Sequence, residues 1–279
     1  ASRVLINRPS GSGKELAARV IHSQSDRANE RFVVANCARL SSERVDAELF
    51  GAESLQSHRR VVGLFEQAHR GTLYFDEICD LPMETQGKIV RAVNEQRFRR
   101  VGGNSEVVVD VRVISASSRD LPVEISEGRL REDLYYRLGV VPLSMPSLAD
   151  RREDIPLLAK YFTNRIAKMI GVKAIRLSDE IFAAMQGYDW PGNVRQMHNV
   201  IETLLIMAPD DRSKPVGLDL LPAEIQNISR QGANSDMEKL LALPLRGARE
   251  EFEREYLETQ LHRFNGNISR MAAFIGMER

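Results

Sequence analysis

A short apolar segment that runs into a glycine-rich loop constrains this chain more than any other feature. Val4–Asn7 has the composition of a buried strand, and the loop after it reads Arg-Pro-Ser-Gly-Ser-Gly before Lys14. A helical pattern then extends from Glu15 to Ser23. Backbone N–H groups in such a loop surround phosphate oxygens at the N-terminus of a helix, where the helix dipole also favours anions. The order of strand, loop and helix therefore predicts a phosphate-binding loop in an α/β fold.

Two positions depart from the usual G-x-x-x-x-G-K-[ST] pattern of such a loop. Arg8 stands where the first glycine is usual, and Glu15 stands where a hydroxyl group would bind Mg²⁺. The alternative is an ordinary glycine-rich turn with a solvated lysine, which the flanking strand and helix disfavour. The loop residues that we expect to bind nucleotide are Gly11, Ser12, Gly13, Lys14 and Glu15.

A later strand ends in two acids. Thr72–Phe75 is apolar, and Asp76 and Glu77 follow it directly. Buried acids are costly unless they are paired or bound to metal, so two of them at one strand end indicate a site. We expect Asp76 to hold Mg²⁺ and Glu77 to polarise the water that attacks a phosphoryl group. The alternative is a surface loop that begins at Asp76.

The first 150 residues alternate short apolar segments with helical patterns. The expected strands are Val4–Asn7, Phe32–Cys37, Thr72–Phe75, Val111–Ala116 and Val140–Leu143. The expected helices lie near Glu15–Ser23, Glu43–Phe50, Glu84–Glu95 and Val123–Leu138. Successive strands with a helix between them are joined by crossover connections, which predict a parallel sheet with helices on both faces.

Strand signals stop at Arg151, and helical patterns follow. They cover Asp154–Ile170, Ser178–Gly187 and Asn193–Met207, which predicts a small helical domain. An amphipathic helix is expected at Gly247–Phe264, and a further helix after the break at residues 265–267. The predicted domains are therefore residues 1–150, a helical domain at 151–228, a linker at 229–244 and a C-terminal domain at 245–279.

Composition excludes several classes of protein. The 279 residues contain 39 Lys and Arg against 39 Asp and Glu, and this neutrality argues against coating of nucleic acid by bulk electrostatics. No run approaches 18 uninterrupted apolar residues, so no membrane span is expected. Only Cys37 and Cys79 are present, and the first residues lack a basic-then-apolar leader, which together predict a cytoplasmic location.

Longer stretches of the chain resemble the bacterial enhancer-binding proteins, the AAA+ ATPases that activate sigma-54 RNA polymerase. The matching runs include GSGKELAARVIH, FVVANCARL, ELFG, GLFEQAHRGTLYFDEICDLP, QRFRRVGG, VDVRVISASSRDL, GRLREDLYYRLGVVPLSMPSLADRREDIPLL and WPGNVRQMHNVIE. The C-terminal segment resembles the Fis-like helix-turn-helix of that family. The resemblance implies an AAA+ P-loop sheet, a helical lid and a truncated all-α helix-turn-helix, with ATP or ADP and Mg²⁺ as cofactors.

The same resemblance implies roles for single residues around the two acids. Asn36 matches the residue that holds the catalytic glutamate in an inactive pose, so it would pair with Glu77. Ser118 stands where the family has asparagine at sensor I, the sensor of the γ-phosphate. The γ-phosphate sensor is therefore altered in this chain.

Three arginines match further family positions. Arg131 and Arg137 match the arginine fingers that reach a neighbouring subunit's site. A planar guanidinium suits that role because the charge of the transition state spreads over the phosphoryl oxygens. Arg195 matches sensor II on the lid helix. The alternative for all three is a solvated helix face. Fingers that act in trans imply a homo-oligomer, either a resting dimer or an active hexameric ring.

One family motif is missing. Family members carry GAFTGA after ELFG in the loop that contacts sigma-54, whereas Phe50-Gly51 is here followed by AESLQSHRRVV. NtrX-type response regulators resemble this chain in that loss. The implied function is a DNA-binding regulator of a two-component system, whose receiver domain and cognate sensor kinase lie outside this chain. Contact with RNA polymerase stays open, and the missing motif argues against contact with sigma-54.

Three functions remain to be compared. The first is Mg²⁺-dependent ATP hydrolysis, and the second is a nucleotide-responsive DNA-binding regulator with little or no turnover, which Arg8, Glu15 and Ser118 favour. The third, an AAA+ unfoldase or loader, is disfavoured by the YYRL and WPGNVR runs. The family has an adenine-binding segment before Val4 and a recognition helix that would begin near Met277. We therefore expect a piece of a longer protein that binds operator DNA weakly or not at all.

Overall fold

The computed structural model describes residues 2–53, 60–209, 212, 215–227, 243–263 and 268–275. These residues form two units by their internal contacts. The first unit comprises Ala1–Ala174 and Asp189–Ile206, and the second comprises Ile175–Tyr188 and Met207–Arg279. The domain boundaries expected from the sequence at residues 150, 228 and 244 remain predictions.

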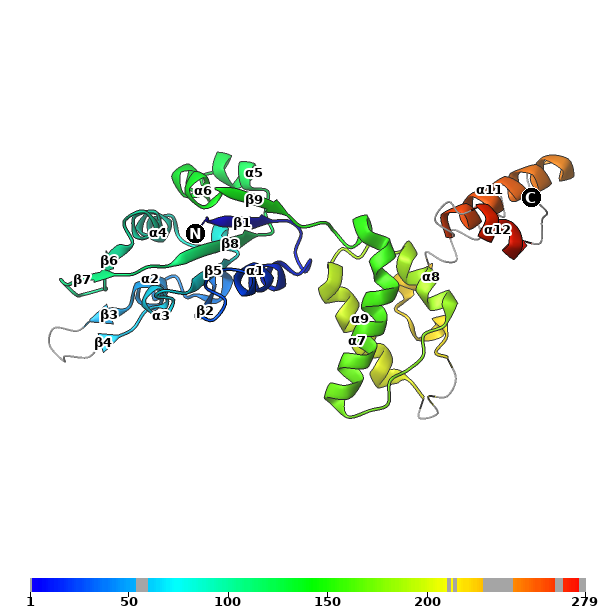
Figure 1. Ribbon diagram of the computed structural model, residues 1–279, viewed down its shortest axis with the longest axis horizontal. Coiled ribbons are helices and arrows are strands. Elements are labelled where there is room, and N and C mark those ends of the chain that lie inside the picture. Colours follow the sequence, from blue (N-terminus) through cyan, green and yellow to red (C-terminus); the bar gives the residue numbers. More distant parts are fainter. Residues whose placement is uncertain are drawn as a thin grey trace. The chain divides into compact units, whose positions relative to one another are not determined.

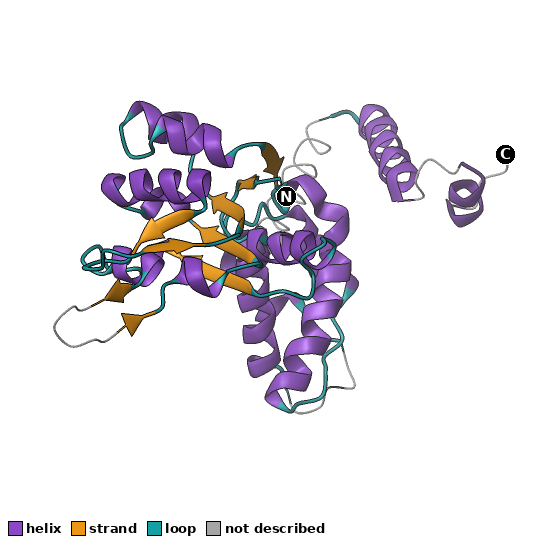
Figure 2. Cartoon of the chain, turned by 60° about the vertical axis from the view of Figure 1, so that its left-hand side comes forward, coloured by secondary structure: helices purple, strands orange, loops and turns teal. Residues whose placement is uncertain are grey.

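The predicted parallel sheet is confirmed as the centre of the first unit (Figure 2). Its five strands lie in the order β2-β5-β8-β1-β9, and all four neighbouring pairs are parallel. Because all the strands are parallel, each connection crosses over the sheet and the carboxyl ends of the strands meet at one edge. The strands are β1 Val4–Asn7, β2 Phe32–Asn36, β5 Thr72–Asp76, β8 Arg112–Ser117 and β9 Val141–Ser144.

Alternate side chains of these strands belong to two separate buried clusters. The ribbon has helices on both sides of the strands (Figure 1). Leu73 and Val113 belong to the larger buried cluster, which the helices α2 to α6 cover. Tyr74 and Ile114 belong to a second cluster, which contains Ala18 of α1. Burial on both faces explains why the strands are almost continuously apolar. The covering helices are α1 Lys14–Ser23, α2 Val45–Phe50, α3 Leu64–Gln67, α4 Met83–Glu95, α5 Leu121–Ser126 and α6 Glu132–Leu138.

The single helix expected over Val123–Leu138 is wrong, because α5 and α6 are separate helices. Gly128 lies between them with φ 70°, a left-handed conformation that ends a helix. The helical spacing of apolar residues persists across the break because Leu130 and Leu134 are buried in the same cluster. Periodicity alone therefore could not reveal the turn.

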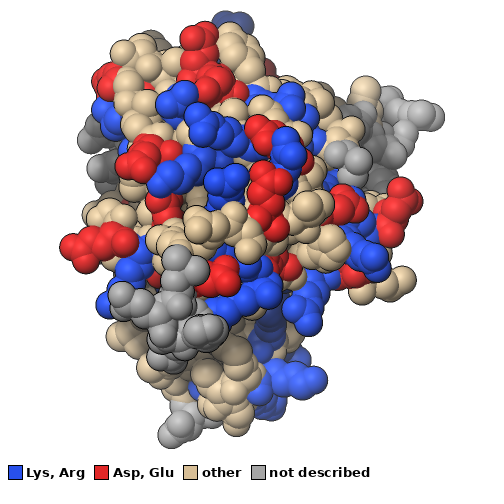
Figure 3. Space-filling model, turned by 90° about the vertical axis from the view of Figure 1, so that its left-hand side faces the viewer, with Lys and Arg blue, Asp and Glu red and all other residues tan. Residues whose placement is uncertain are grey.

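Two short antiparallel ribbons were not expected from the sequence. The first pairs β3 Ala52–Glu53 with β4 Arg60–Val61, and the second pairs β6 Arg97–Arg99 with β7 Glu106–Val108. Strands of two or three residues are too short to give a recognisable pattern. Over the face of the molecule that carries these ribbons, positive and negative side chains are interspersed (Figure 3). This mixture fits the neutral composition.

The predicted helices of the later chain are confirmed with small shifts in their ends. In the first unit Gly171, with φ 74°, is the C-cap of α7 as expected, and in the second Ser178 caps α8 by accepting the Ile181 N–H at 3.3 Å. Residues 223–227 are also helical. The helices are α7 Ile155–Ile170, α8 Asp179–Gly187, α9 Asn193–Met207, α11 Leu245–Arg263 and α12 Ile268–Ile275.

Three expectations fall outside the described residues. They concern residues 229–242 of the linker, the break at residues 265–267 and the start of a recognition helix near Met277. Within the described part of the chain, no helix combines the length and the apolar character that crossing a membrane requires.

Candidate functional site

The glycine-rich loop connects β1 to α1 at the carboxyl edge of the sheet. Gly11 and Gly13 have φ of 73° and 100°, which L side chains rarely adopt. A Cβ atom on Gly11 would also lie 2.3 Å from the carbonyl oxygen of Gly192. Arg8, at the first position of the motif, has φ 57° although it is not a glycine. The loop therefore depends on glycine at Gly11 and Gly13, and it carries one strained non-glycine residue, Arg8, at its start.

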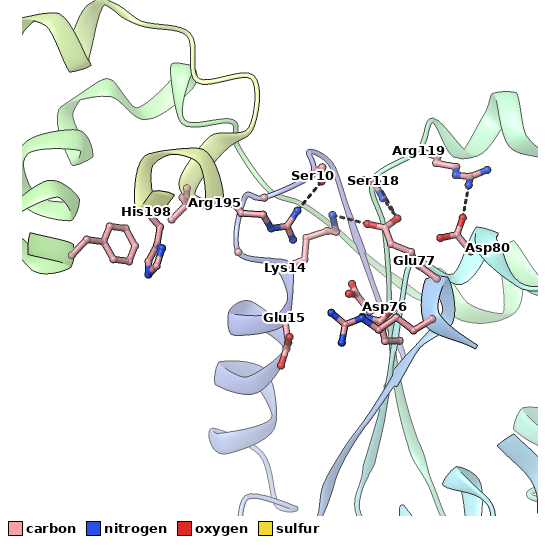
Figure 4. A pocket seen from close by; sticks show the side chains of 17 residues that line it. Ser10, Lys14, Glu15, Asp76, Glu77, Asp80, Ser118, Arg119, Arg195 and His198 are labelled. Carbon is pink, nitrogen blue, oxygen red and sulfur yellow. Dashed lines mark hydrogen bonds and ion pairs between the residues drawn. The ribbon is translucent and has the colours of Figure 1, made fainter. Parts of the chain in front are cut away.

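Lys14 is the first residue of α1, and its side chain points toward the acids of β5 (Figure 4). The lysine is only 6% exposed, and its Nζ atom lies 3.2 Å from Glu77 Oε1. It also donates a hydrogen bond of 3.4 Å to the carbonyl oxygen of Pro9. A buried ammonium group at a helix N-terminus is placed to bind the outer phosphates of a nucleotide.

Asp76 is the last residue of β5 and lies opposite Asn36, the last residue of β2. The Tyr74 hydroxyl donates a hydrogen bond of 3.0 Å to Asp76 Oδ1. Burial, and then the nearby charge of Glu77, raise the pKa of Asp76, against the opposing effect of the Tyr74 bond. A cation beside Asp76 would relieve this unfavourable environment of the carboxylate.

Glu77 binds Ser118, the residue directly after the neighbouring strand β8, instead of the predicted partner Asn36. Glu77 Oε2 accepts hydrogen bonds from the Ser118 backbone N–H at 2.7 Å and from its hydroxyl at 2.9 Å. The side-chain oxygen of Asn36 is buried and has no hydrogen-bond partner among the described residues. Glu77 itself has φ 56°, so its backbone is strained. Two hydrogen bonds and the Lys14 pair maintain this pose.

Arg119 supports the segment that carries Ser118. Its guanidinium contacts Asp80, and a second nitrogen donates to Glu124 Oε2 at 3.1 Å. The Arg119 backbone N–H donates to the Ser117 hydroxyl oxygen at 3.1 Å. Neither motif spacing nor the family resemblance singled out Arg119, although it follows the sensor serines directly in the run SASSRDL.

Arg195 and Asn193, at the start of α9, contact the phosphate-binding loop within the same unit. The Arg195 backbone N–H donates to the Gly11 carbonyl at 3.3 Å, and its Nη1 donates to Ser10 Oγ at 3.4 Å. Asn193 donates to the Ser10 carbonyl at 3.0 Å and accepts the Leu148 N–H at 2.7 Å. Asn193 was missed from the sequence, although the Gly-Asn pair in WPGNVR is a turn signal.

These groups surround one cavity of about 690 Å³. Of the residues expected to bind nucleotide or act on it, nine line this cavity: Gly11, Gly13, Lys14, Glu15, Asn36, Asp76, Glu77, Ser118 and Arg195. Ser12 is buried in the loop and does not line it. Phe162 and His198 also line it, with ring centroids 5.4 Å apart in an edge-to-face arrangement.

Arg131 and Arg137 do not line this cavity. Arg131 forms two hydrogen bonds with Asp133, of 2.9 and 2.8 Å, and Arg137 lies in the last turn of α6. The described residues also contain no cluster of three or more His, Cys, Asp or Glu that would hold a metal ion alone. Mg²⁺ commonly binds through one or two carboxylates together with substrate phosphates, so Asp76 fits that kind of site.

Three protein families match successive parts of the chain. Residues 1–144 match the Sigma-54 interaction domain, and residues 149–238 match the AAA+ ATPase lid domain. Residues 248–279 match the Fis family of bacterial regulatory proteins.

Several full-length relatives are similar to the chain. The nitrogen assimilation regulatory protein NtrX of Azorhizobium caulinodans is 50% identical over 279 residues, which are 100% of this chain and 62% of that protein. The response regulator PilR of Pseudomonas aeruginosa is 43% identical over 235 residues, covering 83% of this chain and 52% of PilR. A crystal structure of NtrX from Brucella abortus in complex with ATP has a TM-score of 0.76 and 49% identity, covering 99% of this chain and 61% of the other.

Proposed function

The chain belongs to the family of the Sigma-54 interaction domain, and we propose that it is the ATP-binding and ATP-hydrolysing part of a DNA-binding transcription regulator. One observation carries this proposal. Lys14, the Asp76–Glu77 pair and Arg195 come from three separate places, the start of α1, the end of β5 and the start of α9, and converge on one cavity at the carboxyl edge of the sheet. Parallel α/β sheets bind ligands at this edge.

Each group has a part in hydrolysis that its position suits. The N–H groups of the loop and the Lys14 ammonium bind the phosphates, and Asp76 holds Mg²⁺. The metal, when bound, neutralises charge that develops on the phosphate oxygens. Glu77 orients the attacking water once its carboxylate leaves Lys14. Arg195 links the loop to α9, so a change at the phosphates would be transmitted to that helix. ATP is bound in the Brucella abortus NtrX crystal structure, which supports this choice of nucleotide.

Arg131 and Arg137 would complete the site of a neighbouring copy. Both lie outside their own chain's cavity, and a guanidinium from a neighbour would stabilise the charge that spreads over the transferred phosphoryl group. This part of the proposal requires a homo-oligomer, with a dimer at rest and a hexameric ring in the active state. Arg131 would exchange its pairing with Asp133 for the neighbour's nucleotide.

The whole protein would be a response regulator without conventional sigma-54 activation. The GAFTGA motif is absent, and the short ribbon of β3 and β4 occupies its place in the chain. DNA binding would come from the Fis-type C-terminal region, and a receiver domain outside these residues would accept the signal of a sensor kinase. An assay of open-complex formation with sigma-54 RNA polymerase tests the first point. We expect no ATP-dependent activation, and strong activation would contradict the proposal.

A nucleotide-responsive regulator with little turnover is the second candidate. The ion pair between Lys14 and Glu77 favours it, because hydrolysis requires both groups to leave this pair. Phosphate release at saturating ATP separates the two functions when wild type is compared with Glu77→Gln. For an ATPase we expect a loss of roughly a hundredfold or more in the variant while ATP still binds. Equal rates with retained binding would refute hydrolysis and leave the second candidate.

A further inference from the structure

Arg39 is a cation of the nucleotide cavity to which the proposed hydrolysis assigns no part. It is the last residue of a single-turn 3₁₀ helix, Cys37–Arg39, which directly follows β2. The residue is exposed, and it lines the same cavity as Lys14 and Asp76. Within the part of the chain that the structure describes, its guanidinium forms no hydrogen bond and no ion pair.

The other lysine and arginine side chains of this cavity have partners. Lys14 Nζ lies 3.2 Å from Glu77 Oε1, and Arg119 contacts two carboxylates. Arg195 donates a hydrogen bond of 3.4 Å to a serine of the phosphate-binding loop. An anion that binds Lys14 or Arg119 has to displace a carboxylate, whereas one that binds Arg39 displaces only solvent. Among the described residues of the lining, Arg39 is therefore the cation most available to an anionic ligand.

The backbone that carries Arg39 is held beside the acids of β5. Asn36, the last residue of β2, pairs in parallel register with Asp76. Cys37 is 2% exposed and belongs to the larger buried cluster, which anchors the start of the turn. The turn also contacts the corresponding turn after β5, Ile78–Asp80. The base of the Arg39 side chain is thus fixed, while its guanidinium is free to meet a ligand in the cavity.

The order of the strands decides which phosphate Arg39 can reach. The phosphate-binding loop follows β1, Asp76 ends β5 and Arg39 follows β2, and these strands lie in the order β1-β8-β5-β2. Neighbouring strands are about 4.8 Å apart, which separates β2 from β1 by roughly 14 Å. A chain of phosphates that is bound by the loop at one end can therefore approach Arg39 only with its outermost group.

We infer that the Arg39 guanidinium binds the γ-phosphate of ATP from within its own chain, on the side of the β5 acids that is opposite to Lys14. This inference rests on the proposed nucleotide site and adds a binding residue to it. A planar guanidinium can donate two parallel hydrogen bonds to phosphate oxygens. ADP lacks the group that Arg39 contacts, so Arg39 favours ATP over ADP.

Arg39→Ala tests this contact by binding rather than by hydrolysis. The affinities of the 279-residue chain for ADP and for the non-hydrolysable ATP analogue AMP-PNP are measured by calorimetry at a fixed excess of Mg²⁺. We expect Arg39→Ala to bind AMP-PNP about tenfold more weakly than wild type, because a hydrogen-bonded charge pair is lost. Its affinity for ADP should stay within about twofold of the wild-type value, since ADP makes no such pair. Arg39→Lys keeps the charge without the planar fork and should lose about threefold in AMP-PNP affinity.

Arg44→Ala is the matched control. Arg44 precedes α2 on the same connection, is exposed and lies outside the cavity, and its side chain has no partner among the described residues. The control removes the same charge and should leave both affinities unchanged. The inference is overturned if Arg39→Ala weakens both nucleotides equally, if it weakens neither, or if Arg44→Ala has the same effect.

The proposed function fails in different ways. If wild type binds neither nucleotide, the proposed site is refuted together with the role of Arg39. If both nucleotides bind but ATP is not turned over, hydrolysis is refuted, and the ratio of the two affinities still decides the role of Arg39.

Discussion

Arg100→Met removes the cation at the centre of a buried ion-pair network between α3 and the segment after β6. Arg100 is 7% exposed and donates to both oxygens of Glu66, from Nε at 2.8 Å and from Nη2 at 2.8 Å. Arg60 donates to the same carboxylate at 2.7 Å, but its side chain is 55% exposed. Methionine has an uncharged side chain of similar length, so the main effect of the variant is that Glu66 loses its buried cationic partner.

The expected cost follows from this geometry. Removing one partner of a buried ion pair destabilises a protein by about 3–5 kcal/mol. Arg60 stays as a partial, solvent-screened partner of Glu66, so we expect a loss of about 2–3 kcal/mol at pH 7. Burial alone would raise the pKa of Glu66, but hydrogen bonds from Arg100 and Arg60 bring it below the ordinary value. This contribution is therefore present above the ordinary carboxyl pKa and is lost as pH falls, so the variant should approach wild type in acid.

Urea unfolding measures the loss. Trp190 is the only tryptophan, is fully buried and belongs to the same unit as Arg100, so its fluorescence reports that unit. Far-UV circular dichroism tests whether the secondary structure is lost in the same transition that the fluorescence reports. Arg97→Met is the matched control, because Arg97 lies on the same hairpin, is 51% exposed and pairs with Glu95 at 3.1 Å. It should cost less than about 1 kcal/mol. Equal losses for the two variants would refute the assignment of stability to the buried network.

Three further outcomes are expected. Hydrogen bonds from Arg129, and then from Arg119, lower the pKa of Glu124 to about 2, so wild type should lose stability as pH falls from the ordinary carboxyl range toward 2. Glu124→Gln should be less stable at pH 7 and show a flatter pH profile of the unfolding midpoint; parallel profiles would contradict this. Arg8 adopts φ 57°, so the free energy of unfolding measured in urea should be roughly 1 kcal/mol higher for Arg8→Gly than for Arg8→Ala. The reverse order would argue against backbone strain at this position. Mixing Glu77→Gln chains with Arg131→Ala chains should recover part of the ATPase rate, because each supplies what the other lacks. Mixtures no faster than the separate variants would exclude fingers acting in trans.

The parallel sheet could be predicted because its signal is local. β1 has the bounds expected from its apolar run, and β5 differs only by including Asp76. These strands are buried on both faces, so an uninterrupted apolar run is required of them. The ribbon of β6 and β7 gives no such signal, since Arg97, Arg99 and Glu106 are exposed and the strands are three residues long.

The site could be predicted only where its residues belong to one motif. Loop spacing places Lys14, and the strand end places Asp76 and Glu77. The contact between Glu77 and Ser118 depends on β8 lying beside β5, and these strands are separated by about 35 residues that include α4 and a ribbon. Sequence patterns give strands but not their order, so the predicted partner came from the family pattern and differs from the one that the structure provides.

Backbone strain gives a physical reason why local patterns are least informative at this site. Non-glycine residues with positive φ include Arg8 at the start of the loop, Glu77 after β5 and Asn193 at the start of α9. Each such residue costs on the order of 1–3 kcal/mol, which the packing of the surrounding core must offset. Local propensity would not place arginine or glutamate in these conformations. Sequence rules that assume unstrained backbone therefore describe the sheet well, and they fail at the positions where Glu77 and the loop are held ready to change partners.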